Sequence, residues 1–140
     1  MPADVDRVVA MMAQLYAHGA SSFEPARARH ATEKLLGEPE FGGAWTIDVD
    51  GATVGYIVVL LGFSLEFGGR IGLLDALFVA ESHRGRGVAV EALAFAEEQC
   101  RAHGCQALRL EVAQDNHRAM SVYRRSGFQM DDRYLMTKWM

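Results

Sequence analysis

The stretch that decides the fold of this chain is LFVAESHRGRGVA, residues 77–89. It begins with apolar residues typical of a strand, continues through a turn with two arginines and two glycines, and ends where a helix begins. Apolar residues then recur at helical spacing at Val88, Ala92, Phe95 and Cys100. The N-terminus of a helix presents unpaired backbone N–H groups and a partial positive charge, so this stretch predicts a site for a phosphorylated ligand.

The length and composition are those of a single globular domain. The 140 residues are 50% hydrophobic and 23% charged, with a net charge of −4, so we expect one domain over residues 1–140. The acidic balance disfavours nucleic-acid binding. The longest apolar run, residues 54–63, is too short to cross a membrane. Cys100 and Cys105 lack the spacing of a metal site or a disulfide framework, and a cytoplasmic location is therefore expected.

Caps, turns and alternating apolar residues predict the remaining elements. Helices are expected over residues 5–18, 25–36, 87–103 and 116–126, and strands over residues 45–49, 53–61, 71–79, 108–112, 128–130 and 134–139. Asp50-Gly51, between two strand-like runs, predicts a tight hairpin turn. The order of elements predicts the α+β class, with a mostly antiparallel sheet and helices on its faces.

Other interpretations of the glycine-rich turn have less support. A dinucleotide-binding loop requires a third glycine where this chain has Val90, and it belongs to a first strand–helix unit rather than to the middle of a chain. A P-loop requires Gly-Lys followed by Ser or Thr, which this turn lacks. Taken alone, Arg84 to Gly87 is also compatible with a solvated surface turn.

Two motifs together resemble those of the GNAT N-acetyltransferase superfamily. Arg84-x-x-Gly87-x-Ala89 is similar to its pyrophosphate-binding signature, and a second motif follows in Asn116, Ala119, Tyr123 and Gly127-Phe128. Asn116 and Tyr123 are seven residues apart, so they share one face of a helix. The resemblance covers roughly residues 53–130 and implies the GNAT fold. The chain begins almost at its first helix, without the strand that usually opens this fold.

The resemblance implies acetyl-CoA as the acetyl donor, with no metal. The turn would hold the pyrophosphate through backbone amides, the end of the preceding strand would pair with the pantetheine arm, and Asn116 would hydrogen-bond the cofactor. The implied cofactor-binding residues are Leu77, Phe78, Val79, Arg84, Gly85, Arg86, Gly87, Val88, Ala89, Asn116, Ala119 and Tyr123.

The same resemblance assigns the catalytic chemistry. The oxyanion formed when an amine attacks a thioester needs a donor, and a backbone N–H of Phe78 or Val79 would supply it. The CoA thiolate needs a proton on leaving, and Tyr123 holds the position of the general acid. The attacking amine must lose a proton, either to Asp75 or through water.

Four carboxylates are candidates for binding a cationic acceptor, namely Glu24, Glu66, Asp75 and Glu111. Alternation along a strand would place Asp75 on the same face as Leu77 and Val79. It could instead pair with an arginine, Arg70 or Arg109. The acids favour a small polyamine-like or aminoglycoside-like acceptor.

Three rival functions stay open from the sequence. One is acetylation of a protein N-terminus or lysine, another is a non-catalytic acyl-CoA-binding module, and a third is a structural dimerisation domain. The apolar residues of the expected strand 134–139 could contact a second subunit, and a homodimer is expected.

Overall fold

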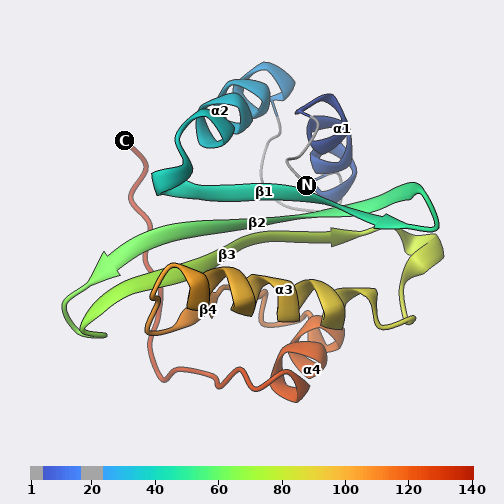
Figure 1. The fold of residues 1–140 in the computed structure, drawn as a ribbon. Coiled ribbons are helices and arrows are strands. Elements are labelled where there is room, and N and C mark those ends of the chain that lie inside the picture. Colours follow the sequence, from blue (N-terminus) through green and yellow to red (C-terminus); the bar gives the residue numbers. More distant parts are fainter. Residues whose placement is uncertain (1–4, 17–23) are drawn as a thin grey trace.

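The computed structural model describes residues 5–16 and 24–140 (Figure 1). Its helices are α1 (Val5–Tyr16), α2 (Pro25–Gly37), α3 (Val88–Ala102) and α4 (His117–Arg125), and its strands are β1 (Gly42–Val49), β2 (Ala52–Ser64), β3 (Gly69–Val79) and β4 (Leu108–Leu110). Short 3-10 turns cover Pro39–Phe41 and Glu81–His83. The α+β class is confirmed.

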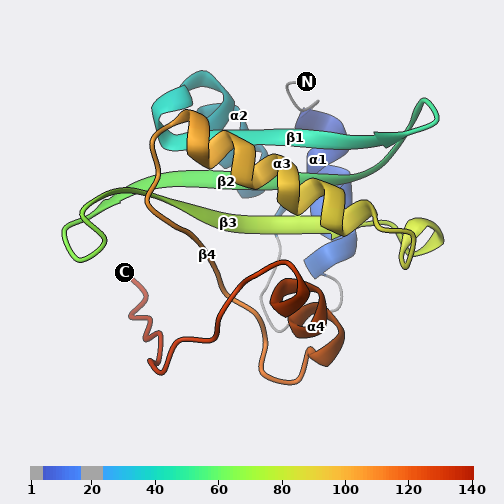
Figure 2. The same ribbon diagram turned by 60° about the horizontal axis from the view of Figure 1, so that its bottom comes forward.

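The four strands form one sheet in the order β1-β2-β3-β4. β1, β2 and β3 are antiparallel neighbours, whereas β4 runs parallel to β3. The hairpin between β1 and β2 is confirmed, because Asp50 and Gly51 both adopt the positive φ that such a tight turn requires. In Figures 1 and 2, α1 and α2 lie on one face of the sheet and α3 and α4 on the other.

Each face of the sheet buries its own apolar cluster. On the α1 side, Tyr56 and Phe78 stack with ring centroids 6.0 Å apart, and Val8 and Met11 of α1 pack with them. On the α3 side, Ile57, Val59 and Leu74 pack against Leu93, Ala96 and Cys100. This two-sided burial explains why β2 is an almost continuous apolar run.

A β-bulge interrupts β3 at Asp75. Val58 lies opposite Ala76 and Val59 lies opposite Leu74, so Asp75 has no residue opposite it on β2. Strict alternation is lost here, because Leu74 and Leu77 belong to the same α3-side cluster although they are three residues apart. The alternation that would have put Asp75 on the face of Leu77 therefore does not hold across this point.

β3 and β4 separate soon after they pair. Their register covers only Gly72–Leu74 of β3 and Leu108–Leu110 of β4. Beyond Leu74, β3 continues to Val79 along β2, and no described strand pairs with its other side. Residues 75–79 thus present a free strand edge, which we call the β3 edge.

Two predicted strands are absent from the structure. Residues 128–130 and 134–139 have no ladder partner among the described residues and form no strand. The expectation of an antiparallel end of the sheet there was wrong, because strand propensity forms a strand only where a second backbone is within reach. The expected end of the first helix near residue 18, and the absence of a strand before it, lie outside the described residues.

Candidate functional site

The turn between β3 and α3 is shaped by two glycines with left-handed backbone. Gly85 has φ 78° and Gly87, the N-cap of α3, has φ 79°. Apart from its chain neighbours, no atom lies within 4 Å of where a Cβ on Gly87 would stand, so there is open space beside the N-terminus of α3 at this residue. This is the geometry in which a helix N-terminus accepts an anion.

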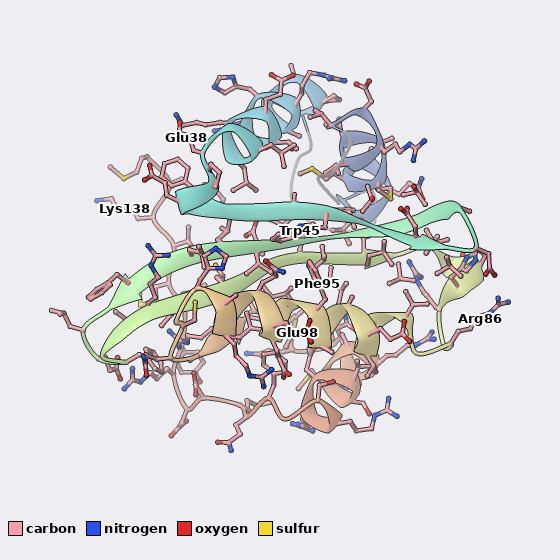
Figure 3. All side chains as sticks on the ribbon, viewed as in Figure 1. Glu38, Trp45, Arg86, Phe95, Glu98 and Lys138 are labelled. Carbon is pink, nitrogen blue, oxygen red and sulfur yellow. The ribbon has the colours of Figure 1, made fainter. Side chains whose placement is uncertain are left out.

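Arg84 fastens this turn to the end of β3. Its Nε donates a hydrogen bond of 2.8 Å to the carbonyl oxygen of Val79, and its guanidinium lies 6.0 Å from the ring centroid of Phe78. Arg84 therefore holds the turn in place in addition to contributing charge. Arg86 extends away from the fold, exposed to solvent (Figure 3).

A third arginine, which the sequence analysis did not single out, lies at the same turn. Nη2 of Arg118, on α4, is 3.7 Å from the position of a Cβ on Gly85. It is exposed and forms no ion pair with any described residue. The signal for it was its place within the second motif, between Asn116 and Ala119.

The start of α4 is organised by Asn116. Its side chain is the N-cap, and Oδ1 accepts a hydrogen bond of 3.2 Å from the N–H of Ala119. The capping role fits the general preference of Asn for this position. The cap fixes the helix that carries Arg118 and Tyr123.

Tyr123 is half-buried in the α3-side cluster, to which Leu77 of the β3 edge also belongs. Its ring meets that of Phe128 edge-on, with centroids 5.8 Å apart. Burial raises the pKa of its phenol, so the hydroxyl stays protonated at neutral pH and can serve as a proton donor.

Asp75 occupies the bulge between the two paired halves of β3. It forms no ion pair with Arg70 or Arg109 among the described residues, and Arg109 pairs with Asp131 at 3.1 Å instead. Asp75 is exposed as a residue, but the atoms packed around its carboxyl partly desolvate that group and so raise the pKa of Asp75. A partly desolvated carboxylate without a cationic partner is suited to binding one.

The other three carboxylates are placed differently. Glu66, in the β2–β3 hairpin, pairs with Arg133 at 2.8 Å, and the hydrogen bond and charge of Arg133 lower the pKa of Glu66. This hairpin lies at the opposite end of β3 from the glycine turn (Figure 1). Glu24 precedes α2 and Glu111 follows β4, and both are exposed. Among the described residues, no ion pair or side-chain hydrogen bond joins these three to Asp75.

Two cavities of about 210 and 220 Å³ lie elsewhere, between β1 and α3. Trp45 lines both, and its ring meets Phe95 edge-on at 5.1 Å in the first (Figure 3). Neither cavity reaches Asp75 or Tyr123. They are spaces left where α3 covers β1 incompletely.

Residues 5–16 and 24–140 contain no cluster of three or more His, Cys, Asp or Glu side chains arranged to hold a metal ion. None of the helices in those ranges has the length and apolar character needed to cross a bilayer.

Comparison with solved structures finds the same fold in an integron cassette protein and in two acetyltransferases. The integron cassette protein HFX_CASS3, from the mobile metagenome of Cole Harbour Salt Marsh, is 34% identical, with a TM-score of 0.87 over 98% of this chain and 85% of its own. The aminoglycoside N-acetyltransferase AAC(6′)-Iy in complex with CoA is 18% identical, with a TM-score of 0.82 over 96% of this chain and 88% of its own. The aminoglycoside 6′-N-acetyltransferase AAC(6′)-IG of Acinetobacter haemolyticus is 19% identical, with a TM-score of 0.81 over 100% and 97%.

Sequence comparison points to the same group of proteins. No curated protein matches the chain in sequence. Residues 9–128, however, match the Acetyltransferase (GNAT) family. This range includes β3, the glycine turn, α3 and α4, which are the elements that build the site. The chain therefore belongs to the GNAT family of acetyltransferases.

Proposed function

We propose that this protein is an N-acetyltransferase that transfers acetyl from acetyl-CoA to a primary amine of a small cationic acceptor. The observation that carries the proposal is the β3 edge, which continues through one short 3-10 turn into the glycine turn at the N-terminus of α3. A strand edge pairs with amide groups, and a helix N-terminus attracts phosphate. Acetyl-CoA carries amide groups in its pantetheine arm and phosphates in the adjoining pyrophosphate. It therefore matches the strand edge and the helix N-terminus in the same order.

The chain's own groups suit the cofactor along its length. The N–H groups at the start of α3, with Arg86 nearby and Gly85 shaping the turn, would hold the pyrophosphate. Arg118 adds a cation beside Gly85. Backbone groups of residues 77–79 would hold the pantetheine. Bound acetyl-CoA supplies the activated acyl group.

The reaction is a direct transfer in a ternary complex. The free amine attacks the acetyl carbonyl while a backbone N–H of Phe78 or Val79 donates to the developing oxyanion. The nitrogen–carbon bond forms, the carbon–sulfur bond breaks, and the CoA sulfur takes the phenol proton of Tyr123. Asp75 binds the acceptor ammonium, and the proton lost by the amine passes to that carboxylate or to water.

The acceptor class follows from charge. Asp75 has no cationic partner among the described residues, and the chain carries a net charge of −4, so a cation is attracted to the acceptor side. Glu24 and Glu111, both exposed, would add to this field. Glu66 contributes less, since Arg133 already neutralises it.

A panel of amines tests the proposal. CoA release from acetyl-CoA is measured with polyamines, aminoglycosides, amino acids and peptides as acceptors, and the product is identified by mass spectrometry. Acetylation of a polyamine or an aminoglycoside, and not of neutral amino acids or peptides, is the expected result. Tight acetyl-CoA binding without acetylation of any amine would leave only a cofactor-binding module, and preferred acetylation of peptides would exclude the small-molecule acceptor.

A further inference from the structure

Two cysteines, Cys100 and Cys105, flank the C-terminal end of α3, and both are free thiols. Cys100 lies in the last turn of the helix and Cys105 lies three residues beyond its end. On a continuing helix, two residues five apart would point about 140° away from one another. The spacing in the sequence therefore gives no reason to expect these side chains to meet.

The end of α3 reverses the chain and brings the two cysteines together. The N–H of Cys105 donates a hydrogen bond of 2.9 Å to the carbonyl oxygen of Cys100, and the N–H of Gly104 donates one of 3.1 Å to that of Arg101. These two bonds, with the positive φ of Gly104, define a Schellman motif. In this motif the side chains at the two outer positions, here the cysteines, frequently contact one another. A side-chain hydrogen bond joins the two thiols.

Cys100 is the inner of the two thiols. It is 5% exposed and belongs to the α3-side cluster. Its sulfur lies against β3 at Gly72, where a Cβ would overlap it, so the absence of a side chain at Gly72 leaves the space that the sulfur occupies. Burial, together with the neighbouring Cys105 thiol, raises the pKa of Cys100 to about 11. Cys100 is therefore shielded from reagents in solution.

Cys105 is the outer thiol. It packs against the same cluster, but part of the residue is open to solvent. The residues that follow it are tied to β3, because the N–H of Gln106 donates to the carbonyl oxygen of Arg70 at 2.7 Å and the N–H of Gly72 donates to that of Ala107 at 2.9 Å. Cys105 is thus held beside Cys100 while it remains accessible to a small reagent.

We propose that Cys105 and Cys100 are a redox-active pair, which a small disulfide oxidant converts into an intramolecular disulfide that fastens the end of α3 to the segment entering β4. The Schellman contact sets the two side chains face to face, as a disulfide requires. The pair lies at the end of α3 opposite the glycine turn (Figure 1). This modification site is therefore separate from the acetyl-transfer site proposed above.

The oxidation takes place in two thiol–disulfide exchanges. The Cys105 thiol loses its proton and its sulfur attacks one sulfur of the oxidant, whose S–S bond breaks as the other half leaves and takes up that proton. The Cys100 thiol then loses its proton and its sulfur attacks Sγ of Cys105, and the second half of the oxidant leaves with that proton. Two electrons pass from the cysteines to the oxidant, which is reduced to two thiols.

Oxidised glutathione is the probe that tests the pair. The folded protein is incubated with it, denatured, alkylated to label every remaining thiol, and weighed intact. The wild type is expected to lose the mass of two hydrogens, to retain no glutathione and to take up no alkylating group, and dithiothreitol should restore both thiols. A wild type that keeps both thiols, or that stops with glutathione attached, would overturn the proposal.

Two single variants test the order of reaction, after circular dichroism has shown that each is folded. Cys100→Ala leaves only the outer thiol and should stop with one glutathione attached. Cys105→Ser leaves only the buried thiol and should react at a rate at least about ten times lower, because a buried thiol of raised pKa is unreactive. Equal rates in the two variants would contradict Cys105 as the point of entry.

The disulfide should stabilise the fold without disturbing the proposed cofactor site. Closing the loop between Cys100 and Cys105 restricts the unfolded chain, so the Tm of the oxidised form should exceed that of the reduced form by a few degrees. The further rise in Tm produced by acetyl-CoA should be the same in both forms. A lower Tm on oxidation would contradict a pair that the native fold holds ready to close. The thiol measurements involve no acetyl-CoA, so they separate failure of this inference from failure of the proposed function.

Discussion

Two side chains, Tyr123 and Asp75, hold their protons more tightly than they would in water, and burial is the cause in both. The consequences differ. A phenol that stays protonated keeps the proton that passes to the CoA thiolate in the proposed reaction. A carboxylate with a raised pKa ionises less readily, and it is stabilised in its charged form when a cation binds beside it.

The role of Tyr123 is tested by replacing it with Phe. The substitution keeps the ring and its edge-on contact with Phe128 but removes the hydroxyl. We expect kcat to fall by about 10²–10⁴-fold, the usual contribution of a general acid, with the Kd for acetyl-CoA almost unchanged. Tyr134→Phe, at an exposed position near the C-terminus, is the control, because it removes a phenol without effect on the reaction. Loss of cofactor binding with kcat preserved would assign Tyr123 to packing instead.

Asp75→Asn separates stability from activity. The pKa of Asp75 is raised in the folded state, so the folded protein holds this proton more tightly than the unfolded chain does. The protonated carboxyl therefore contributes its full share to the free energy of unfolding in acid, below the ordinary pKa of 3.8. That contribution is lost as the pH rises through the raised pKa. The variant should therefore have a higher Tm than the wild type at pH 7, and the difference should vanish as the pH falls towards 4. The KM for a cationic amine should rise.

Asp132→Asn provides the matched control for that variant. It removes one negative charge from an exposed position near the C-terminus, outside the proposed site. Its KM should equal that of the wild type. If both variants raise the KM equally, net charge rather than Asp75 attracts the acceptor.

At the scale of elements, the turn before α3 depends on a glycine backbone conformation that other residues adopt only with strain. Gly87 and Gly104 flank α3, with φ of 79° and 72°, and neither has an atom within 4 Å of a Cβ position. They lie at opposite ends of the helix, Gly87 as its N-cap and Gly104 just after its C-cap. The two glycines are therefore a matched pair.

Replacing each of these glycines by Ala tests the anion site. Both variants should lose stability by about 1 kcal/mol, because Ala is strained at positive φ. Only Gly87→Ala should also weaken acetyl-CoA binding, since in the proposed complex its methyl group would crowd the phosphate at the N-terminus of α3. The thermal shift produced by acetyl-CoA measures this. Equal shifts in both variants would place the cofactor elsewhere.

At the scale of the whole molecule, the proposed site exists only because three separate segments meet. β3 supplies a free edge, α3 supplies a helix N-terminus, and α4 supplies Tyr123 and Arg118. The divergence of β4 from β3 after Leu74 leaves that edge unpaired.

The sequence by itself determined the features that depend on near neighbours along the chain. Asp50-Gly51 predicted the first hairpin, Gly104 the end of α3, and the paired motifs around Gly87 and Tyr123 the family. Turns and caps are local because each satisfies backbone groups within a few residues. These predictions required no knowledge of how the helices pack against the sheet.

Only the tertiary structure decided the features that need two distant segments. Strand propensity over residues 134–139 produced no strand, since no second backbone pairs with it. The bulge at Asp75 follows from the register with β2, and Arg133 reaches Glu66 across 67 residues of chain. The carboxylate of Glu66, a candidate for binding substrate, is thus engaged by a residue that local sequence could not indicate. Hydrogen-bond ladders and ion pairs form between whichever groups the fold brings together. The separation of two residues along the sequence does not predict whether they will pair in this way.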